Sequence, residues 1–113
     1  MGSDRRRPTH SLEEAKRLAA QGDFTINGRS RQFIINHMGA CAGVRRVVAG
    51  VVLAILPEHF EKSVPLRRVD GQWGDVYRFV PYAGEEWYVK LFLGGDGSLA
   101  LNVMSANWEG YIH

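Results

Sequence analysis

Cysteine is almost absent from this sequence. The single cysteine, Cys41, excludes an internal disulfide and a cysteine-rich metal site within the chain. Such a composition is typical of proteins from a reducing compartment, so we expect a cytoplasmic location. Cys41 lies in the run GACAGV, where small neighbours favour a buried packing thiol over a nucleophile.

Long hydrophobic runs are also missing. The longest, VVAGVVLAIL from Val47 to Leu56, is about half as long as a membrane-spanning helix, which needs roughly 20 residues. The run is internal, whereas the hydrophobic part of a signal peptide lies near the N-terminus. We therefore expect no membrane partner.

Motifs for metal, nucleotide and hydrolase chemistry are lacking too. The four histidines show no metal-ligand spacing such as H-E-x-x-H, so we expect no metal and no cofactor. The GGDG segment that begins at Gly94 lacks the lysine and the Ser/Thr of a P-loop and predicts a hairpin turn. No G-x-S-x-G motif occurs in the sequence.

Arginine is what the sequence has in excess. The net charge is only +2, yet arginine supplies 11 of the 14 basic residues and lysine the other 3. The planar guanidinium binds phosphate through two parallel hydrogen bonds, so this bias favours an anionic partner. Ordinary surface arginines explain the composition equally well.

The order of secondary-structure signals predicts an α+β fold. A chain of 113 residues is the size of one domain. We predict a disordered basic arm over residues 1–10 and a folded domain over 11–113. Helical patterns occupy 11–62, an antiparallel sheet occupies 64–105, and a short tail follows. This order favours N-terminal helices packed on one face of a curved sheet.

The helical half contains three segments. Ser11 and Glu14 have the spacing of a capping box, and Gly22 is a suitable stop for the helix that they begin. A second short helix is predicted around 30–38, although the FII run in this segment would also suit a strand. A third, apolar nearly all round, covers 43–56 and is expected to be the buried central helix. The EHFEKS segment after it is predicted to form a turn and one last helical turn.

The second half predicts strands. The turn signals DG, AG and GGDG divide residues 64–105 into four strand-length pieces. In EEWYVKLFLG, apolar residues alternate with more polar ones, so Tyr88 and Lys90 lie side by side on the open face. In WGDVYRFV, Val76 and Val80 are predicted to face the helices, although Arg78 between them does not fit that face.

An aromatic residue beside cations on an exposed sheet suits single-stranded RNA. A base stacks on the ring of Tyr88 while cations such as Lys90 hold phosphates, and the basic segment 62–68 enters the same sheet. The alternative is that Tyr88 and Lys90 are simply favourable exposed strand residues. The residues alone leave both interpretations open.

Four segments resemble the MqsR toxins. RRRPTHSLEEAKRLAAQG is similar to their opening, a basic arm with Pro and Thr before a first helix that ends in glycine. LPEHFEKSV resembles their L-x-x-x-D/H-F-x-K-S segment, WGDVYR their W-Q-D-V-Y-R, and WYVKLFL their V-Y-L-K-I/L strand. The matches keep their order and spacing over nearly the whole chain, with the best region from Leu56 to Leu93.

The resemblance implies a fold, an activity and a partner. MqsR proteins are toxins of type II toxin–antitoxin pairs with a RelE-like fold, in which helices pack on one face of a curved antiparallel sheet. They cut single-stranded mRNA without metal, and a cognate antitoxin protein silences them. The expected function is a metal-independent endoribonuclease (an mRNA interferase) that acts by attack of the RNA 2′-hydroxyl.

The resemblance also implies site residues. The family's active lysine and tyrosine correspond to Lys62 and Tyr88, whereas Gly74 stands where the family has a glutamine. Gln72 lies two positions earlier, which preserves the strand face, and is the candidate substitute. The residues expected to bind RNA are Lys90, Arg67, Arg68, Arg78 and Trp73. Neighbouring strand residues point to opposite faces, so at most one of Arg67 and Arg68 serves the site.

Two other functions stay open. Gly74 in place of the glutamine favours a non-catalytic nucleic-acid- or protein-binding module of the same fold. A scaffolding or antitoxin-style interaction protein, with an edge strand open to β-augmentation, is the third interpretation. Cleavage of RNA by the purified chain separates the first interpretation from these two.

Overall fold

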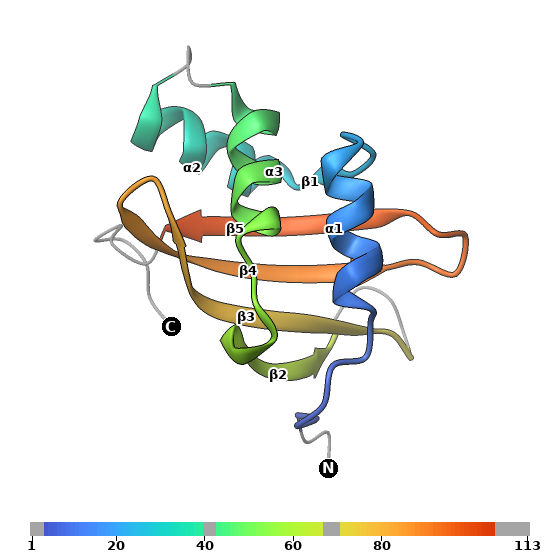
Figure 1. Cartoon of the computed structure of the whole chain (residues 1–113). Coiled ribbons are helices and arrows are strands. Elements are labelled where there is room, and N and C mark those ends of the chain that lie inside the picture. Colours follow the sequence, from blue (N-terminus) through green and yellow to red (C-terminus); the bar gives the residue numbers. More distant parts are fainter. Residues whose placement is uncertain (1–3, 40–42, 67–70, 106–113) are drawn as a thin grey trace.

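The computed structural model describes residues 4–39, 43–66 and 71–105, in which helices pack on a five-stranded sheet (Figure 1). The helices are α1 (Leu12–Ala20), α2 (Gly28–Met38) and α3 (Val44–Leu53), followed by the 3₁₀ helix η2 (Pro57–His59). The strands are β1 (Thr25–Ile26), β2 (Phe60–Pro65), β3 (Trp73–Tyr82), β4 (Glu85–Leu93) and β5 (Leu99–Ser105). The predicted α+β class, with helices on a curved sheet, is confirmed.

The sheet has the strand order β1-β5-β4-β3-β2. Strands β2 to β5 form the predicted antiparallel meander. The short strand β1 pairs in parallel with β5, so the sheet is mixed. Strand β1 was not predicted, because two residues are too few to show an alternating pattern.

The core lies between the sheet and the helices α1 and α3, which cross the same face of the sheet (Figure 1). The helices contribute Ala15, Leu18 and Ala19 from α1 and Val47, Val48, Val51 and Val52 from α3. The strands contribute alternate residues, among them Trp87, Val89, Leu91, Leu99, Leu101 and Val103. Full burial of one such large side chain contributes roughly 1.5–3 kcal/mol. The prediction of a buried central helix is therefore confirmed for α3.

Helix α1 begins at the predicted cap, with one difference. Ser11 Oγ accepts a hydrogen bond from the backbone N–H of Glu14 at 3.1 Å. The carboxylate of Glu14 does not complete the capping box but pairs with Arg17 one turn later. The hydrogen bond from Arg17 lowers the pKa of Glu14 below its ordinary value. Gly22, with a φ of +74°, follows the C-cap residue Gln21.

The EHFEKS segment, predicted as a turn and a last helical turn, is helical only at its start: residues 58 and 59 belong to η2, and residues 60–63 belong to strand β2. Pro57 begins η2, and the chain is extended from Phe60 onward, with Lys62 paired to Val76 of β3. The ring of Phe60 packs edge-on against the ring of Tyr77, with 5.6 Å between centroids. Pairing with β3 and this aromatic contact stabilise the strand, and both come from residues distant in sequence.

The phase of β3 also differs from the prediction at Val76. Asp75 and Tyr77 face the helices, and Val76 lies on the opposite face, outside the helix-side core. A β-bulge between Tyr77 and Val80 then shifts the alternation, so Val80 faces the helices as predicted. The burial of Asp75 is compensated because its carboxylate accepts hydrogen bonds from the backbone N–H groups of residues 9 and 10.

The arm that was predicted to be disordered is described from Asp4 onward and contacts the sheet. Arg5 forms an antiparallel bridge with Ser63, through N–H···O bonds of 2.7 and 2.9 Å. Thr9 Oγ1 lies 2.7 Å from Ser63 Oγ, and its N–H donates to Asp75 at 2.9 Å. The segment therefore lies along the outer edge of β2.

Candidate nucleic-acid interface

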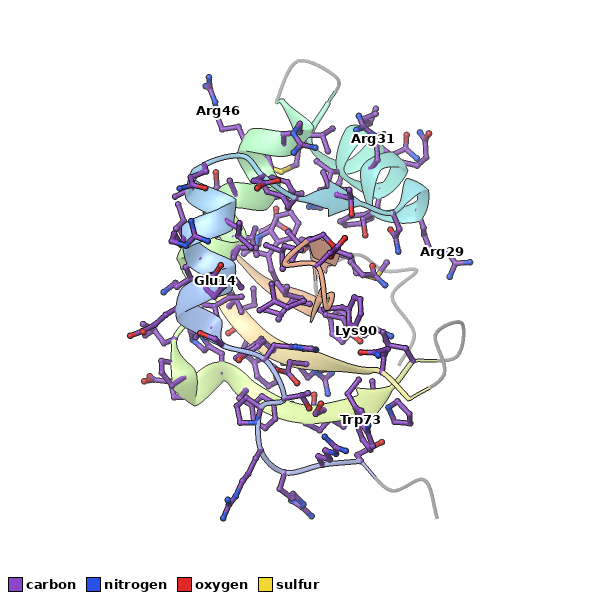
Figure 2. All side chains as sticks on the ribbon, turned by 90° about the vertical axis from the view of Figure 1, so that its right-hand side faces the viewer. Glu14, Arg29, Arg31, Arg46, Trp73 and Lys90 are labelled. Carbon is purple, nitrogen blue, oxygen red and sulfur yellow. The ribbon has the colours of Figure 1, made fainter. Side chains whose placement is uncertain are left out.

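The sheet face that α1 and α3 leave uncovered carries a row of four paired residues, of which all but Val76 are polar. Lys62 of β2 pairs with Val76, Val76 with Lys90, and Lys90 with Asn102 of β5. Neighbouring strands lie about 4.8 Å apart, so the Cα atoms of Lys62 and Lys90 are about 10 Å apart. Figure 2 shows Lys90 on the side of the sheet away from α1, whereas Arg46 of α3 extends from the side that α1 covers. We call this surface the open face.

Tyr88 lies on the same open face. It is two residues from Lys90 along β4, which is about 7 Å, and it pairs with Met104 of β5. The Cα atoms of Tyr88 and Lys62 are then about 12 Å apart, a separation that neighbouring groups of one RNA strand can bridge. This register confirms that Tyr88 and Lys90 share a face and adds Lys62 to it.

Core packing forces these side chains outward. Trp87, Val89 and Leu91 are fully buried against the helices, so Tyr88 and Lys90 between them must face the other way. A shift of the register by one residue would bury the lysine and the phenol and expose the three apolar side chains. The orientation of Tyr88 and Lys90 is therefore maintained by the hydrophobic core itself.

The cations of the open face differ in their partners. Lys62 Nζ lies 3.3 Å from a carboxylate oxygen of Asp4, and Arg78 Nη1 lies 3.3 Å from one of Glu61. Both pairs are substantially exposed, and exposed ion pairs contribute only about 0–1 kcal/mol. Among the described residues, no carboxylate pairs with Lys90. A phosphate can therefore bind Lys90 directly and can displace the carboxylates from the other two cations.

Gly74 lies on the open face, two residues before Val76. A Cβ atom built there would lie 3.0 Å from Leu66 Cδ2 and 3.2 Å from Lys90 Cγ and Cδ. A side chain at position 74 would thus project between Leu66 and Lys90. The position where this chain departs from the MqsR pattern therefore adjoins the row of lysines.

Gln72 is separated from this group. Its carbonyl oxygen accepts the N–H of Leu66 at 2.9 Å, so the hairpin pairing continues to it, but β3 begins only at Trp73. Gln72 is four residues from Val76, which is about 13 Å along the strand, in the direction away from Tyr88. The structure does not bring Gln72 together with Lys62 and Tyr88.

The remaining residues predicted to bind RNA do not share one position: Arg78 is on the open face, Trp73 contacts the arm, and two arginines lie outside the described residues. The guanidinium of Arg5 lies 3.8 Å from the centre of the Trp73 ring, and the Trp73 carbonyl is 2.6 Å from His10 Nε2, so Trp73 contacts the arm. Arg67 and Arg68 lie outside the described residues. Arg78 lies in the β3 bulge, beside an aromatic residue, Phe79, that the sequence analysis did not single out. The misfit of Arg78 in the VYRFV segment was the sequence signal of this bulge, which also involves Phe79.

Other kinds of site have little support in the described residues. Within residues 4–39, 43–66 and 71–105, no three His, Cys, Asp or Glu side chains are grouped so that they could hold a metal ion. No helix of this part of the chain has both the length and the apolar character needed to cross a membrane. The chemistry that the open face offers is that of two lysines, an arginine and a phenol.

Comparison with known proteins gives one match. A family model described as "Motility quorum-sensing regulator, toxin of MqsA" matches residues 7–105. This span includes the end of the arm, the three α-helices and every strand of the sheet. No curated protein matches the chain.

Proposed function

The chain belongs to the MqsR toxin family, the toxins of toxin–antitoxin systems, and we propose that it cleaves single-stranded mRNA in the cytoplasm. Its partner in such a system is an antitoxin protein. The observation that supports endoribonuclease activity is the grouping of Lys62, Lys90 and Tyr88 on the open face. Cations beside an aromatic ring on an exposed sheet are suited to a flexible RNA strand.

The lysines bind the phosphate backbone in this proposal. Lys90 has no carboxylate partner among the described residues and receives the first phosphate. Lys62 releases the carboxylate of Asp4 and makes a second contact with the phosphate backbone, which is feasible because the ion pair of Lys62 with Asp4 is exposed. Binding by such contacts weakens as the salt concentration rises, since each phosphate contact releases condensed counterions.

The proposed reaction is an internal transesterification. The RNA 2′-oxygen attacks the adjacent phosphorus and loses its proton, the bond to the 5′-oxygen breaks, and that oxygen gains a proton. The products are a 2′,3′-cyclic phosphate and a 5′-hydroxyl. Lys62 and Lys90 stabilise the negative charge on the phosphorane, and such a donor contributes roughly 3–4 kcal/mol. Tyr88 positions the nucleotide by stacking or exchanges a proton with it.

A second candidate function is binding of RNA without cleavage. It is favoured by Gly74, which offers no functional group where the MqsR pattern has a glutamine, and by the distance of Gln72 from Tyr88. In this case the same face binds nucleic acid or protein, and the cations contribute affinity only.

The test is an incubation of the purified chain with a 5′-labelled single-stranded RNA in the presence of a chelator, followed by mapping of the ends. We expect cleavage with cyclic-phosphate ends and no cleavage of the all-deoxy oligonucleotide. Lys62→Ala should lower kcat at least 100-fold, since it removes a charge-stabilising donor. The matched control is Arg46→Ala, which removes an exposed cation from the helical side and should leave kcat unchanged.

Two outcomes decide against this assignment. If Lys62→Ala cleaves the RNA with a kcat within about twofold of that of the parent chain, Lys62 has no role in catalysis. If the parent chain retards RNA on a gel but leaves it intact, the non-catalytic function is correct.

A further inference from the structure

Phe79 is unusual in exposure and in backbone conformation. The residue is 59% exposed, and the other large hydrophobic residues that are exposed in the described chain are Leu53 and Leu56, at 46% each. Its φ is +61°, inside a strand. The only other described non-glycine residue with positive φ is Ala83, which forms a two-residue hairpin turn with Gly84, where this conformation is normal.

Stability does not explain a phenylalanine at this position. Positive φ brings Cβ close to the following carbonyl oxygen, a contact that glycine avoids. A residue that is 59% exposed also recovers little of the free energy of burial. Glycine or asparagine would fit the bulge more easily. An unfavourable conformation that carries an exposed aromatic side chain points to a function for the ring.

The bulge places Phe79 beside Tyr88. The pairings on either side of it leave two β3 residues, Arg78 and Phe79, opposite the single β4 residue Tyr88. Bulges of this kind redirect side chains next to functional sites. The guanidinium carbon of Arg78 lies 5.5 Å from the centre of the Phe79 ring. A cation and an exposed aromatic ring thus adjoin the candidate site.

We propose that Phe79 and Arg78 form a base-binding subsite next to Tyr88, in which Phe79 stacks on an unpaired nucleobase and Arg78 binds the neighbouring phosphate. The inference rests on the proposed function, because it assigns the second nucleotide of the same RNA strand. Arg78 is available because its ion pair with Glu61 is exposed and weak. A purine offers the larger stacking surface, so the subsite favours a purine over a pyrimidine.

The test uses 2′-O-methyl oligoribonucleotides, which lack the attacking hydroxyl and so report binding alone. One abasic residue is moved along the oligonucleotide, and Kd is measured by fluorescence anisotropy. The variants are Phe79→Ala and Phe79→Trp, with Leu53→Ala as the control for loss of an exposed apolar side chain. We expect Phe79→Ala to weaken binding about tenfold, and Phe79→Trp and Leu53→Ala to bind like the parent chain.

The abasic series identifies the stacked base. With the parent chain, an abasic residue at one position should raise Kd about tenfold. With Phe79→Ala, an abasic residue at the same position should not raise Kd any further. Phe79→Gly should retain or raise Tm while it weakens binding, which separates the role of the ring from a role in folding. Weaker binding together with a lower Tm in Phe79→Gly would overturn the inference.

The remaining outcomes distinguish the subsite from the proposed function. If Phe79→Ala binds as tightly as the parent chain, the subsite is overturned, while Lys62-dependent cleavage, measured separately, still stands. If the parent chain binds no single-stranded RNA, both are overturned. If the abasic penalty is spread evenly over all positions, the face binds phosphates only and Phe79 is not a base-stacking residue.

Discussion

Gly74 is the residue at which the open face lacks a functional group that the MqsR pattern supplies. A Cβ atom there would approach Leu66 Cδ2 to 3.0 Å and the stem of Lys90 to 3.2 Å. Both neighbours are ends or flexible parts of side chains, so they can shift by a few tenths of an ångström. The backbone of Gly74 does not have positive φ, so a larger residue is compatible with the strand.

We therefore expect Gly74→Gln to raise kcat/KM for RNA cleavage about tenfold. The amide would add a hydrogen-bond donor beside Lys90, directed at the same phosphate. Gly74→Ala is the matched control, because it introduces the same Cβ contacts without a polar group. The measurement is kcat/KM on one labelled RNA together with Tm for each variant. Equal effects of Gln and Ala would show that the amide plays no part.

At the scale of elements, the N-terminal arm and strand β2 act together. The arm contacts buried polar groups on the helical side of the sheet through Asp75, and it reaches the open face through the pair between Asp4 and Lys62. Between these contacts, Arg5 pairs with the outer edge of β2 at Ser63. This bridge occupies part of the edge that a β-augmenting partner would need, which argues against the third interpretation of the sequence.

Asp75 is the anchor of the arm, and Asp75→Asn tests it. Its two carboxylate oxygens accept the N–H groups of Thr9 and His10 at 2.9 and 2.8 Å. An asparagine keeps the shape but turns one acceptor into a donor, so one N–H is left unpaired. We expect the free energy of unfolding to fall by about 1–3 kcal/mol and trypsin to cleave the arm faster.

Urea unfolding and limited proteolysis measure these two effects. Asp23→Asn is the control, since Asp23 is an exposed carboxylate and the substitution makes the same change of charge. Unchanged stability and unchanged cleavage of the arm in Asp75→Asn would mean that the arm does not depend on this residue.

At the scale of the whole molecule, the two sides of the sheet have opposite characters. The helical side encloses the apolar core, with Tyr77 only 1% exposed, and the open side presents Lys62, Lys90 and Arg78. Burial, and secondarily the negative charge of Asp75, raise the pKa of Tyr77 to about 12. The ordinary pKa of tyrosine, about 10, applies to the unfolded chain.

This difference predicts a loss of stability at high pH. Between pH 10 and 12 the unfolded chain releases the Tyr77 proton while the folded chain keeps it. The free energy of unfolding therefore falls by up to about 1.4 kcal/mol per pH unit, reaching about 2 kcal/mol at pH 12. Tyr77→Phe should remove this part of the slope, and Tyr82→Phe is the matched control. The measurement is urea unfolding at several pH values, and identical slopes in the parent chain and Tyr77→Phe would contradict the prediction.

Local sequence patterns were sufficient to predict a large part of the fold. The cap at Ser11, the apolar stretch of α3 and the alternation that directs Tyr88 and Lys90 away from the core can all be read from neighbouring residues. Each depends on backbone geometry and side-chain periodicity over a few positions, which the amino-acid order specifies directly. The motifs that indicated the MqsR family are likewise local, and the family match over residues 7–105 confirms them.

Only the tertiary structure decided how the strands meet. Lys62 is on a strand because β3 pairs with it, and Asp75 is buried because the arm, more than 60 residues earlier, supplies its hydrogen-bond donors. The bulge that sets Phe79 opposite Tyr88, and the distance of Gln72 from both, follow from strand register. Register results from contacts between segments far apart in the chain, and no pattern within one segment contains it.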